Sequence, residues 1–131
     1  MIIHKPTDIE EQIRTALGPY ITVYVRPLPA SYTLPNIMVT ANGGSTANTI
    51  DTFTVTLSSR AETDAEALEY LNDALGVLAE QGAAQVGAIR NVTINSLASW
   101  GTDPVRPDLK LCTATVLVTA HRESKTINKK T

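Results

Sequence analysis

Side chains that could serve as nucleophiles, general bases or metal ligands are few and far apart in this sequence. The 131 residues include one cysteine, Cys112, and two histidines, His4 and His121. A single cysteine excludes an intramolecular disulfide and a zinc site built from several thiolates. Cys112 alternates with alanine and valine, which favours a buried, unreactive thiol. We expect His121, near a strand end, to be a surface or interface side chain, and His4 to have no catalytic role either.

Other catalytic and ligand-binding motifs are also missing. No Gly-x-Ser-x-Gly elbow occurs, and residues 43–45, the only glycine-rich loop, lack the lysine and following helix of a phosphate loop. The carboxylates between residues 62 and 80 do not have the spacing of a calcium-binding loop. The sequence therefore predicts no catalytic residue, no cofactor and no metal site.

Composition favours one folded domain. Hydrophobic residues make up 43% of the chain and charged residues 18%, enough apolar surface for a core. The net charge of −2 lacks the basic excess of a protein that binds duplex DNA. The absence of a long apolar run predicts a protein made in a cytoplasm, without a membrane partner. We expect a domain over residues 1–122 and a flexible basic tail over 123–131.

The first half of the chain predicts one helix and three strands. A capping box formed by Thr7 and Glu10 starts a helix with one apolar face, which Gly18 and Pro19 end. The alternation of apolar and polar residues predicts strands over 20–26, 36–40 and 50–59. Between them lie a proline-rich loop, 27–35, and a polar, glycine-bearing loop, 41–49, typical of a hairpin tip.

The second half opens with a long helix that is acidic on one side. Thr63 and Glu66 form its capping box, and Gly82 is the expected C-terminal stop. Residues 61–82 contain six acids and no base, whereas the rest of the chain has 11 bases and seven acids. The apolar stripe consists of Leu68, Leu71, Leu75 and Leu78, and the acids Glu62, Glu66, Glu69, Asp73 and Glu80 lie opposite. The acidic side is either a solvated face or a partner surface.

Two more strands complete the fold. The first lies within residues 89–100, with a bend near Asn95 and Ser96, and the second spans 110–122. The order α, β, β, β, α, β, β predicts an α+β two-layer sandwich. In it, two helices cover one face of a largely antiparallel, four- to five-stranded sheet.

Threonines dominate the other face of the predicted sheet. Thr52, Thr54, Thr56, Thr113, Thr115 and Thr119 alternate with apolar residues. This face is either open to water or packed against the sheet of a neighbouring subunit. Trp100, beside a turn, fits either a core edge or an interface anchor. The candidate interface residues are Glu62, Glu66, Glu69, Asp73, Arg26, Arg60, Arg90, Pro29, Tyr32, Asn42, Gly43 and Trp100.

The order and texture of these elements resemble the tail terminator proteins of long-tailed bacteriophages. The resemblance covers about residues 7–122. It rests on the opening helix with Ile9 and Ile13, the strand over 20–25, the polar hairpin and the strand over 53–57. It also rests on residues 65–71, which open the long helix, and on residues 100–104 before the final strand.

The resemblance implies a virion protein that acts by assembly alone. Such subunits form a ring, typically a hexamer, at the head-proximal end of the tail tube. There they stop tube polymerisation, present a surface to the head-tail connector and let DNA pass through the lumen. The acidic helix would then face either Arg26, Arg60 or Arg90 of the next subunit, or the lumen.

Three alternatives remain open at this stage. The first is a head-completion or other neck protein. The second is a small ligand-binding module or enzyme that uses the threonine-rich face near His121. The third is a nucleic-acid-binding role for the lysines between Lys125 and Lys130, which are too few for firm binding at physiological salt.

Overall fold

The computed structural model describes residues 1–47 and 50–130. Asn48 and Thr49, at the end of the predicted hairpin loop, and Thr131 lie outside the described residues. The elements are β1 (Ile2–Lys5), α1 (Ile9–Leu17), β2 (Val23–Val25), β3 (Asn36–Ala47), β4 (Ile50–Ala61), α2 (Asp64–Ala83), β5 (Ile89–Thr102), β6 (Lys110–His121) and β7 (Glu123–Thr126).

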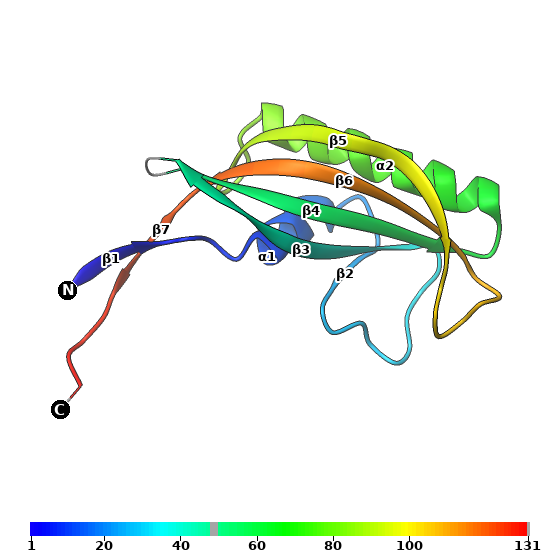
Figure 1. The fold of residues 1–131 in the computed structure, drawn as a ribbon, viewed down its shortest axis with the longest axis horizontal. Helices are drawn as coiled ribbons and strands as arrows, with labels where there is room; N and C mark the ends of the chain where they lie inside the picture. The colour runs from blue at the N-terminus through cyan, green and yellow to red at the C-terminus, as the bar shows by residue number, and fades with distance from the viewer. Residues whose placement is uncertain (48–49, 131) are drawn as a thin grey trace.

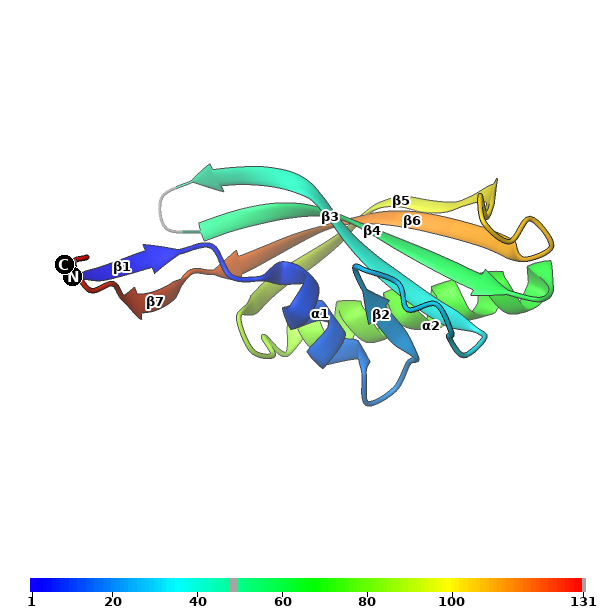
Figure 2. The ribbon, with the colours of Figure 1, turned by 90° about the horizontal axis from the view of Figure 1, so that it is seen from below.

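The main sheet has five strands in the order β2-β3-β4-β6-β5, and its pairs are antiparallel except for β2 with β3 (Figure 1). Both helices pack on one face of this sheet, as Figure 2 shows from below. Among the described residues no helix or strand covers the other face. The predicted two-layer α+β sandwich is thus confirmed.

The core fills the space between the helices and the sheet. Alternate residues of β4 and β6 point to the helices, among them Val55, Leu57 and Val116, all fully buried. From the helix side Ile13 and Leu71 meet them, also fully buried. Leu68, predicted to belong to the same stripe, is 36% exposed at the margin of α2. The period of two in the strands and 3.6 in the helices produces this single apolar layer.

The helix ends differ in part from the sequence prediction. The N-cap of α1 is Asp8 rather than Thr7, since the Asp8 carboxylate accepts a hydrogen bond from Glu11 N–H at 3.3 Å. Thr63 is the N-cap of α2, as predicted, and its Oγ1 accepts from Glu66 N–H at 3.2 Å. Gly82 does not end α2. It lies buried in the last turn against Val92, and the chain turns back at Gln85 and Gly87, both with positive φ.

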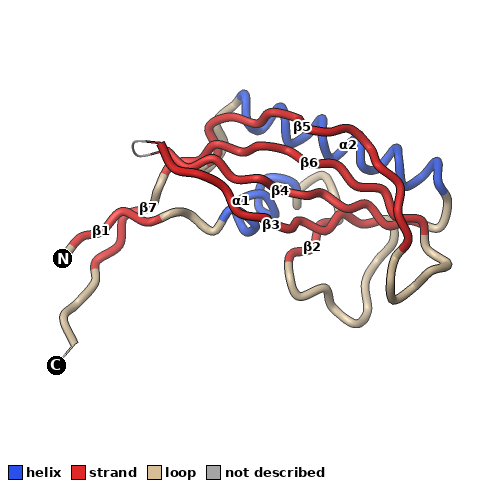
Figure 3. The backbone as a smooth tube through the Cα atoms, viewed as in Figure 1, coloured by secondary structure: helices blue, strands red, loops and turns tan. Residues whose placement is uncertain are grey.

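The hairpin formed by β3 and β4 is longer than the sequence indicates. Residues 41–47, predicted as loop, continue β3 past a bulge between Ala41 and Gly44 (Figure 3). The bulge requires glycine, because Gly43 has φ of 102° and a Cβ on Gly44 would meet the Thr52 carbonyl oxygen at 2.1 Å. Weak strand formers are held extended here by pairing with a strong strand.

Both chain ends form a small sheet that the sequence did not predict. β1 and β7 pair antiparallel, with Ile3 opposite Lys125 and Lys5 opposite Glu123. The pair projects beyond the main sheet, and we call residues 1–5 with 123–130 the terminal arm (Figure 1). The first part of the predicted basic tail is therefore a strand.

Candidate assembly surfaces

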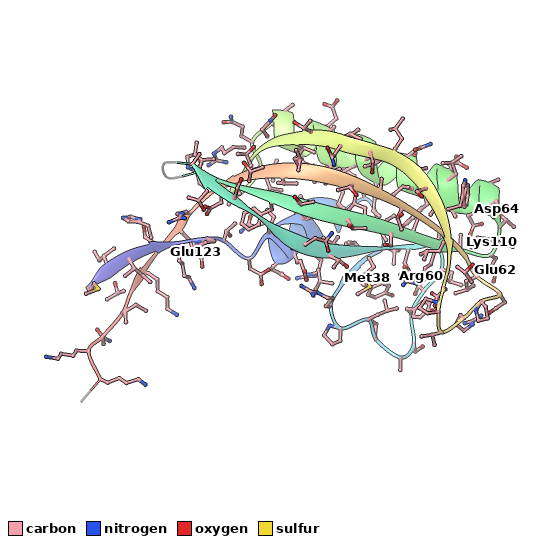
Figure 4. All side chains as sticks on the ribbon, in the orientation of Figure 1. Met38, Arg60, Glu62, Asp64, Lys110 and Glu123 are labelled. Atoms are coloured by element: carbon pink, nitrogen blue, oxygen red, sulfur yellow. The ribbon has the colours of Figure 1, made fainter. Side chains whose placement is uncertain are left out.

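The outer side of α2 carries a concentrated negative charge. Its inner side is buried through Leu71, Ala74, Leu75 and Leu78, which turns the acids outward. The acidic face, as we define it, consists of Glu66, Glu69, Asp73 and Glu80 on this outer side together with Glu62 and Asp64 where the helix begins, all exposed. Asp64 and Glu66 lie in the first turn, where carboxylates favour the positive end of the helix dipole. Figure 4 labels Glu62 and Asp64 where α2 begins.

No member of the acidic face has an ion-pair partner within the described part of the chain. The other acids are treated differently, since all but the helix cap Asp8 are paired with a base. These pairs are Lys5–Glu123, Arg14–Glu11, Arg26–Glu10, Arg60–Asp103, Arg106–Asp108 and Arg122–Asp51. Unpaired acids are thus concentrated at α2 among the described residues.

Arg26, a predicted interface residue, joins α1 to the sheet. Its Nη2 donates to Glu10 Oε2 at 2.7 Å, and the same oxygen accepts from Ala41 N–H at 2.9 Å. Burial by itself raises the pKa of Glu10, but the hydrogen bonds from Arg26 and Ala41 outweigh it and leave that pKa below its ordinary value. This carboxylate therefore connects the first helix with β3.

Arg60 is a brace between the end of β4 and the β5–β6 loop. Its side chain, labelled in Figure 4, is 12% exposed. Its Nε donates to Asp103 Oδ2 at 2.6 Å. The other oxygen of Asp103 accepts from Val105 N–H at 2.9 Å and Arg106 N–H at 3.1 Å. Burial by itself raises the pKa of Asp103. The hydrogen bonds from these backbone donors and from Arg60 outweigh burial and leave that pKa below its ordinary value.

Arg90 caps the turn between α2 and β5. Its Nη1 donates to the carbonyl oxygens of Gly87 at 2.7 Å, Ile89 at 2.9 Å and Gln85 at 3.2 Å. All three arginines predicted to meet the acidic face of a neighbour therefore have partners in their own subunit. Among the described residues, the bases without an acidic partner are Arg90, Lys110, Lys125, Lys129 and Lys130.

The proline-rich loop and the β5–β6 loop project from the same end of the molecule (Figure 1). Pro29 is exposed and Tyr32 is partly buried. The loop is tied down beyond them, because Thr33 N–H donates to the Tyr24 hydroxyl at 3.1 Å and Asn36 Nδ2 donates to the Thr33 carbonyl at 2.9 Å. These hydrogen bonds fix the end of the loop that carries the exposed Pro29.

Asn42 and Gly43 lie on β3 rather than in a free loop. The side-chain amide of Asn42 donates to Thr56 Oγ1 at 2.5 Å, across the hairpin. Gly43 forms the bulge described above. Both residues are exposed, on the long hairpin that extends from the sheet toward the end where the terminal arm projects (Figure 1).

The edge strand β5 exposes a row of apolar side chains. Ile94 is 42% exposed, Leu97 is 72% exposed and Trp100 is 51% exposed. Pairing with β6 is irregular between Ile94 and Ser99, so this edge is bent as well as apolar. A long apolar edge strand offers unpaired backbone groups to another chain. Of the three residues, the sequence identified only Trp100. The sequence did contain a signal for an irregular edge, because Leu97 lies out of phase with Val92 and Ile94.

The threonine-rich face is the side of the sheet away from the helices. Thr52, Thr54 and Thr56 of β4 are partly exposed there, as are Thr113, Thr115 and Thr119 of β6. Among the described residues, the His121 side chain makes no hydrogen bond or ion pair and so has no acid–base partner there. Cys112 is fully buried on the opposite face, and burial raises the pKa of its thiol.

Metal-binding clusters and membrane-spanning helices would each point to a function. In the described residues, no group of three or more His, Cys, Asp or Glu side chains lies close enough together to hold a metal ion. Within the same part of the chain, no helix is long and apolar enough to cross a membrane. Comparison with family models finds no match, and comparison with curated proteins finds no relative of significant similarity.

Proposed function

We propose that this chain is a virion structural protein of the tail terminator type. Its copies close into a ring, which we expect to be a hexamer, on the head-proximal end of the tail tube. The ring stops tube polymerisation and forms the surface to which the head-tail connector or a head-completion protein binds. DNA passes through the lumen without sequence-specific contacts.

The unpaired acidic face carries this proposal. Four carboxylates, those of Glu66, Glu69, Asp73 and Glu80, lie on one exposed side of α2, with Glu62 and Asp64 where the helix begins. Like charges this close repel one another, and every ion pair between described residues is made elsewhere. Such a surface costs the isolated subunit a little stability and is explained by a partner that supplies positive charge. Alternatively, the acidic face lines the lumen of the ring, where its negative charge repels DNA and lets the DNA slide through.

Two other features support assembly rather than catalysis. The apolar edge of β5 and the acidic face are different surfaces of one subunit, and a ring needs patches that differ in this way, because each copy contacts the next head to tail. The resemblance to tail terminators in element order points in the same direction. His121, without a hydrogen-bonded partner among the described residues, gives the ligand-binding alternative no acid–base pair.

Mass photometry and negative-stain electron microscopy test the proposal. The full chain is examined alone and with polymerising tail tube protein. We expect rings in solution or on tube ends, and shorter tubes when the chain is present. A protein that stays monomeric at high concentration and caps no tube contradicts the proposal. Rings that copurify with heads rather than tails indicate the neck-protein alternative.

A charge reversal makes the test specific to α2. The variant Glu66→Lys/Glu69→Lys removes the negative centre of the acidic face, and we expect at least tenfold weaker ring formation. The control Glu11→Lys/Asp108→Lys changes the net charge equally, but at exposed acids that are already paired. Equal loss in both variants would show an effect of net charge alone.

A further inference from the structure

A groove runs along α2 on the side that faces the turn after α1. Its volume is about 590 Å³, and its apolar lining includes Ile21, Val77 and Tyr20. Tyr20 is 66% exposed, although it lies against a helix. Asp73 and Glu80, two members of the acidic face, stand at the rim. The groove therefore has an apolar lining and a negatively charged rim.

Gly76 lies in the same groove, in the middle of α2. Glycine is less favourable than alanine in a helix interior, because it loses more backbone freedom on folding. Outside the adjoining backbone of its own helix, a Cβ added to Gly76 would meet no atom within 4 Å, so packing against other described residues does not account for the glycine. Gly82 of the same helix is the opposite case, since its Cβ would meet Val92 at 2.7 Å. An approaching chain would find at Gly76 a helix backbone without a side chain.

The terminal arm has the complementary character. Its tip is apolar, with Met1 84%, Ile2 70% and Ile127 41% exposed. The tip is ordered by the backbone, because Ile127 N–H donates to the Met1 carbonyl at 2.8 Å. Among the described residues, neither strand of the arm makes extensive contact with another helix or strand. The lysines without an acidic partner on the arm are Lys125, Lys129 and Lys130.

A two-stranded ribbon alone is only marginally stable in water, so a projecting apolar arm is expected to pack against a further surface. The arm extends away from the helices of its own subunit, at the end opposite the proline-rich loop and the β5–β6 loop (Figure 1 and Figure 2). The groove of its own subunit is therefore out of its reach. A second copy of the chain offers the same groove in a different position.

We infer that the terminal arm of one copy binds in the α2 groove of the next copy. This inference rests on the proposed self-assembly and names the contact that would make it. The apolar tip with Ile2 covers Gly76 and Val77, and the arm lysines meet Asp73 and Glu80. The lengths agree, since the four residues of β1 span about 13 Å. The helix from residue 72 to 81 spans about 14 Å.

An arm and a groove are different surfaces, so each copy uses its arm on one neighbour and its groove on the other. Such a contact is heterologous, and it closes into a ring when the rotation between copies permits. The contact also places cations beside part of the acidic face, which makes no ion pair with the described residues of its own subunit.

A pair of variants separates the two halves of the contact. Gly76→Leu places a side chain in the groove. Because the new Cβ meets no atom within 4 Å outside the adjoining backbone of its own helix, we expect an unchanged or higher melting temperature. Ile2→Asp/Ile127→Asp spoils the arm tip without touching the main core. Each variant alone is expected to weaken assembly at least tenfold, measured by mass photometry with and without tail tube.

Mixing the two variants gives the most specific result. The arm variant still has an intact groove, and the groove variant still has an intact arm, so one contact can form between them. We expect a one-to-one dimer that grows no further. A second test exchanges charges. Asp73→Lys/Glu80→Lys and Lys125→Glu/Lys129→Glu should each reduce assembly, and a copy that carries all four substitutions should recover it.

The outcomes distinguish this inference from the proposed function. Wild-type rings with equally good rings from Gly76→Leu and from the arm variant overturn the arm-to-groove contact and leave the ring intact. Rings of Gly76→Leu that no longer cap tubes also overturn it, and assign the groove to the tube protein. A wild-type chain that forms no ring even on tube ends contradicts both. Variants that lose assembly by unfolding are recognised by their melting temperature, and recovery by the charge exchange then decides.

Discussion

The two helices begin with similar acids but use them differently. In α1, Glu10 and Glu11 of the first turn both bind arginines, Arg26 and Arg14. In α2, Asp64 and Glu66 of the first turn bind no base among the described residues, nor do the four other members of the acidic face. Charge near α1 is paired within the subunit, whereas the charge on α2 has no ion-pair partner among the described residues. We propose that a neighbouring copy supplies that partner.

This difference shows that a basic side chain on the surface is not necessarily available to a partner, because it can be engaged by an acid of its own subunit. Arg26, Arg60 and Arg122 each connect elements far apart in the sequence, and they use carboxylates that the fold brings to them. We call the Arg26–Glu10, Arg60–Asp103 and Arg122–Asp51 pairs the braces. Removing a brace should destabilise the fold, whereas changing the acidic face should alter association and change the stability of the subunit only slightly.

The largest effect is expected for Arg60→Ala. The substitution leaves the carboxylate of Asp103, whose side chain is 4% exposed, without its cation. Removing one partner of a buried pair costs about 3 kcal/mol of unfolding free energy. Urea unfolding measures the loss. Arg106→Ala is the control, because its pair with Asp108 is exposed and contributes about 0.5 kcal/mol or less. Similar losses in both variants would contradict the brace.

The next largest effects are expected for the two glycines of α2, of which Gly82 is buried and Gly76 is exposed. Gly82→Ala places a Cβ 2.7 Å from Val92 and should destabilise the protein by about 1–3 kcal/mol. Gly76→Ala meets nothing within 4 Å outside the adjoining backbone of its own helix and should stabilise it by about 0.5–1 kcal/mol through helix propensity. Thermal unfolding of both variants gives the two signs. A loss of stability for Gly76→Ala would indicate packing on the outer side within the subunit.

Local signals in the sequence account for most of the fold. The alternation around Phe53 and Val116 predicts β4 and β6 almost to their ends, and Thr63 marks the start of α2. These elements are determined by periodicity and capping, which act over a few residues. The layer arrangement then follows from having two helices and one sheet.

What the sequence missed depends on contacts between distant residues. β1 and β7 have only four residues each and exist through pairing between the chain ends. The extension of β3 over residues 41–47 comes from its partner strand, since its own residues are poor strand formers. The partners of Arg26 and Arg60 lie 16 and 43 residues away. The α2 groove likewise needs Tyr20 against a helix that begins more than 40 residues later.

Acid should weaken the braces. Asp103 and Glu10 have lowered pKa values because, although burial acts in the opposite direction, hydrogen bonds favour their charged forms. The pKa of Asp51 is lowered by its hydrogen bond from Arg122 and then by that from Thr46. Such groups bind protons more readily in the unfolded chain. Their stabilisation is present above the ordinary carboxyl pKa of about 4 and is lost as the pH falls through the lowered values.

The pH dependence of Asp103→Asn measures this contribution. We expect lower stability than wild type at neutral pH, because the charged partner of Arg60 is gone. Below about pH 4 the two curves should approach each other, since the wild-type carboxylate also loses its charge there. Urea unfolding between pH 7 and pH 3 gives both curves. Curves that stay parallel would show that the charge of Asp103 does not contribute.

The smallest effect compares one acid in each helix. Glu69 of α2 has Glu66 and Asp73 at i−3 and i+4, and like charges at these spacings destabilise a helix. Glu69→Gln should therefore raise the unfolding free energy by about 0.3 kcal/mol, while weakening ring formation. Glu11→Gln removes an attractive pair with Arg14 and should lower it by about as much, with rings unaffected. Opposite signs in stability, with assembly changed only by the α2 substitution, would separate charge that serves the fold from charge that serves a neighbour. Equal signs would mean that the acids of α2 are balanced within the subunit after all.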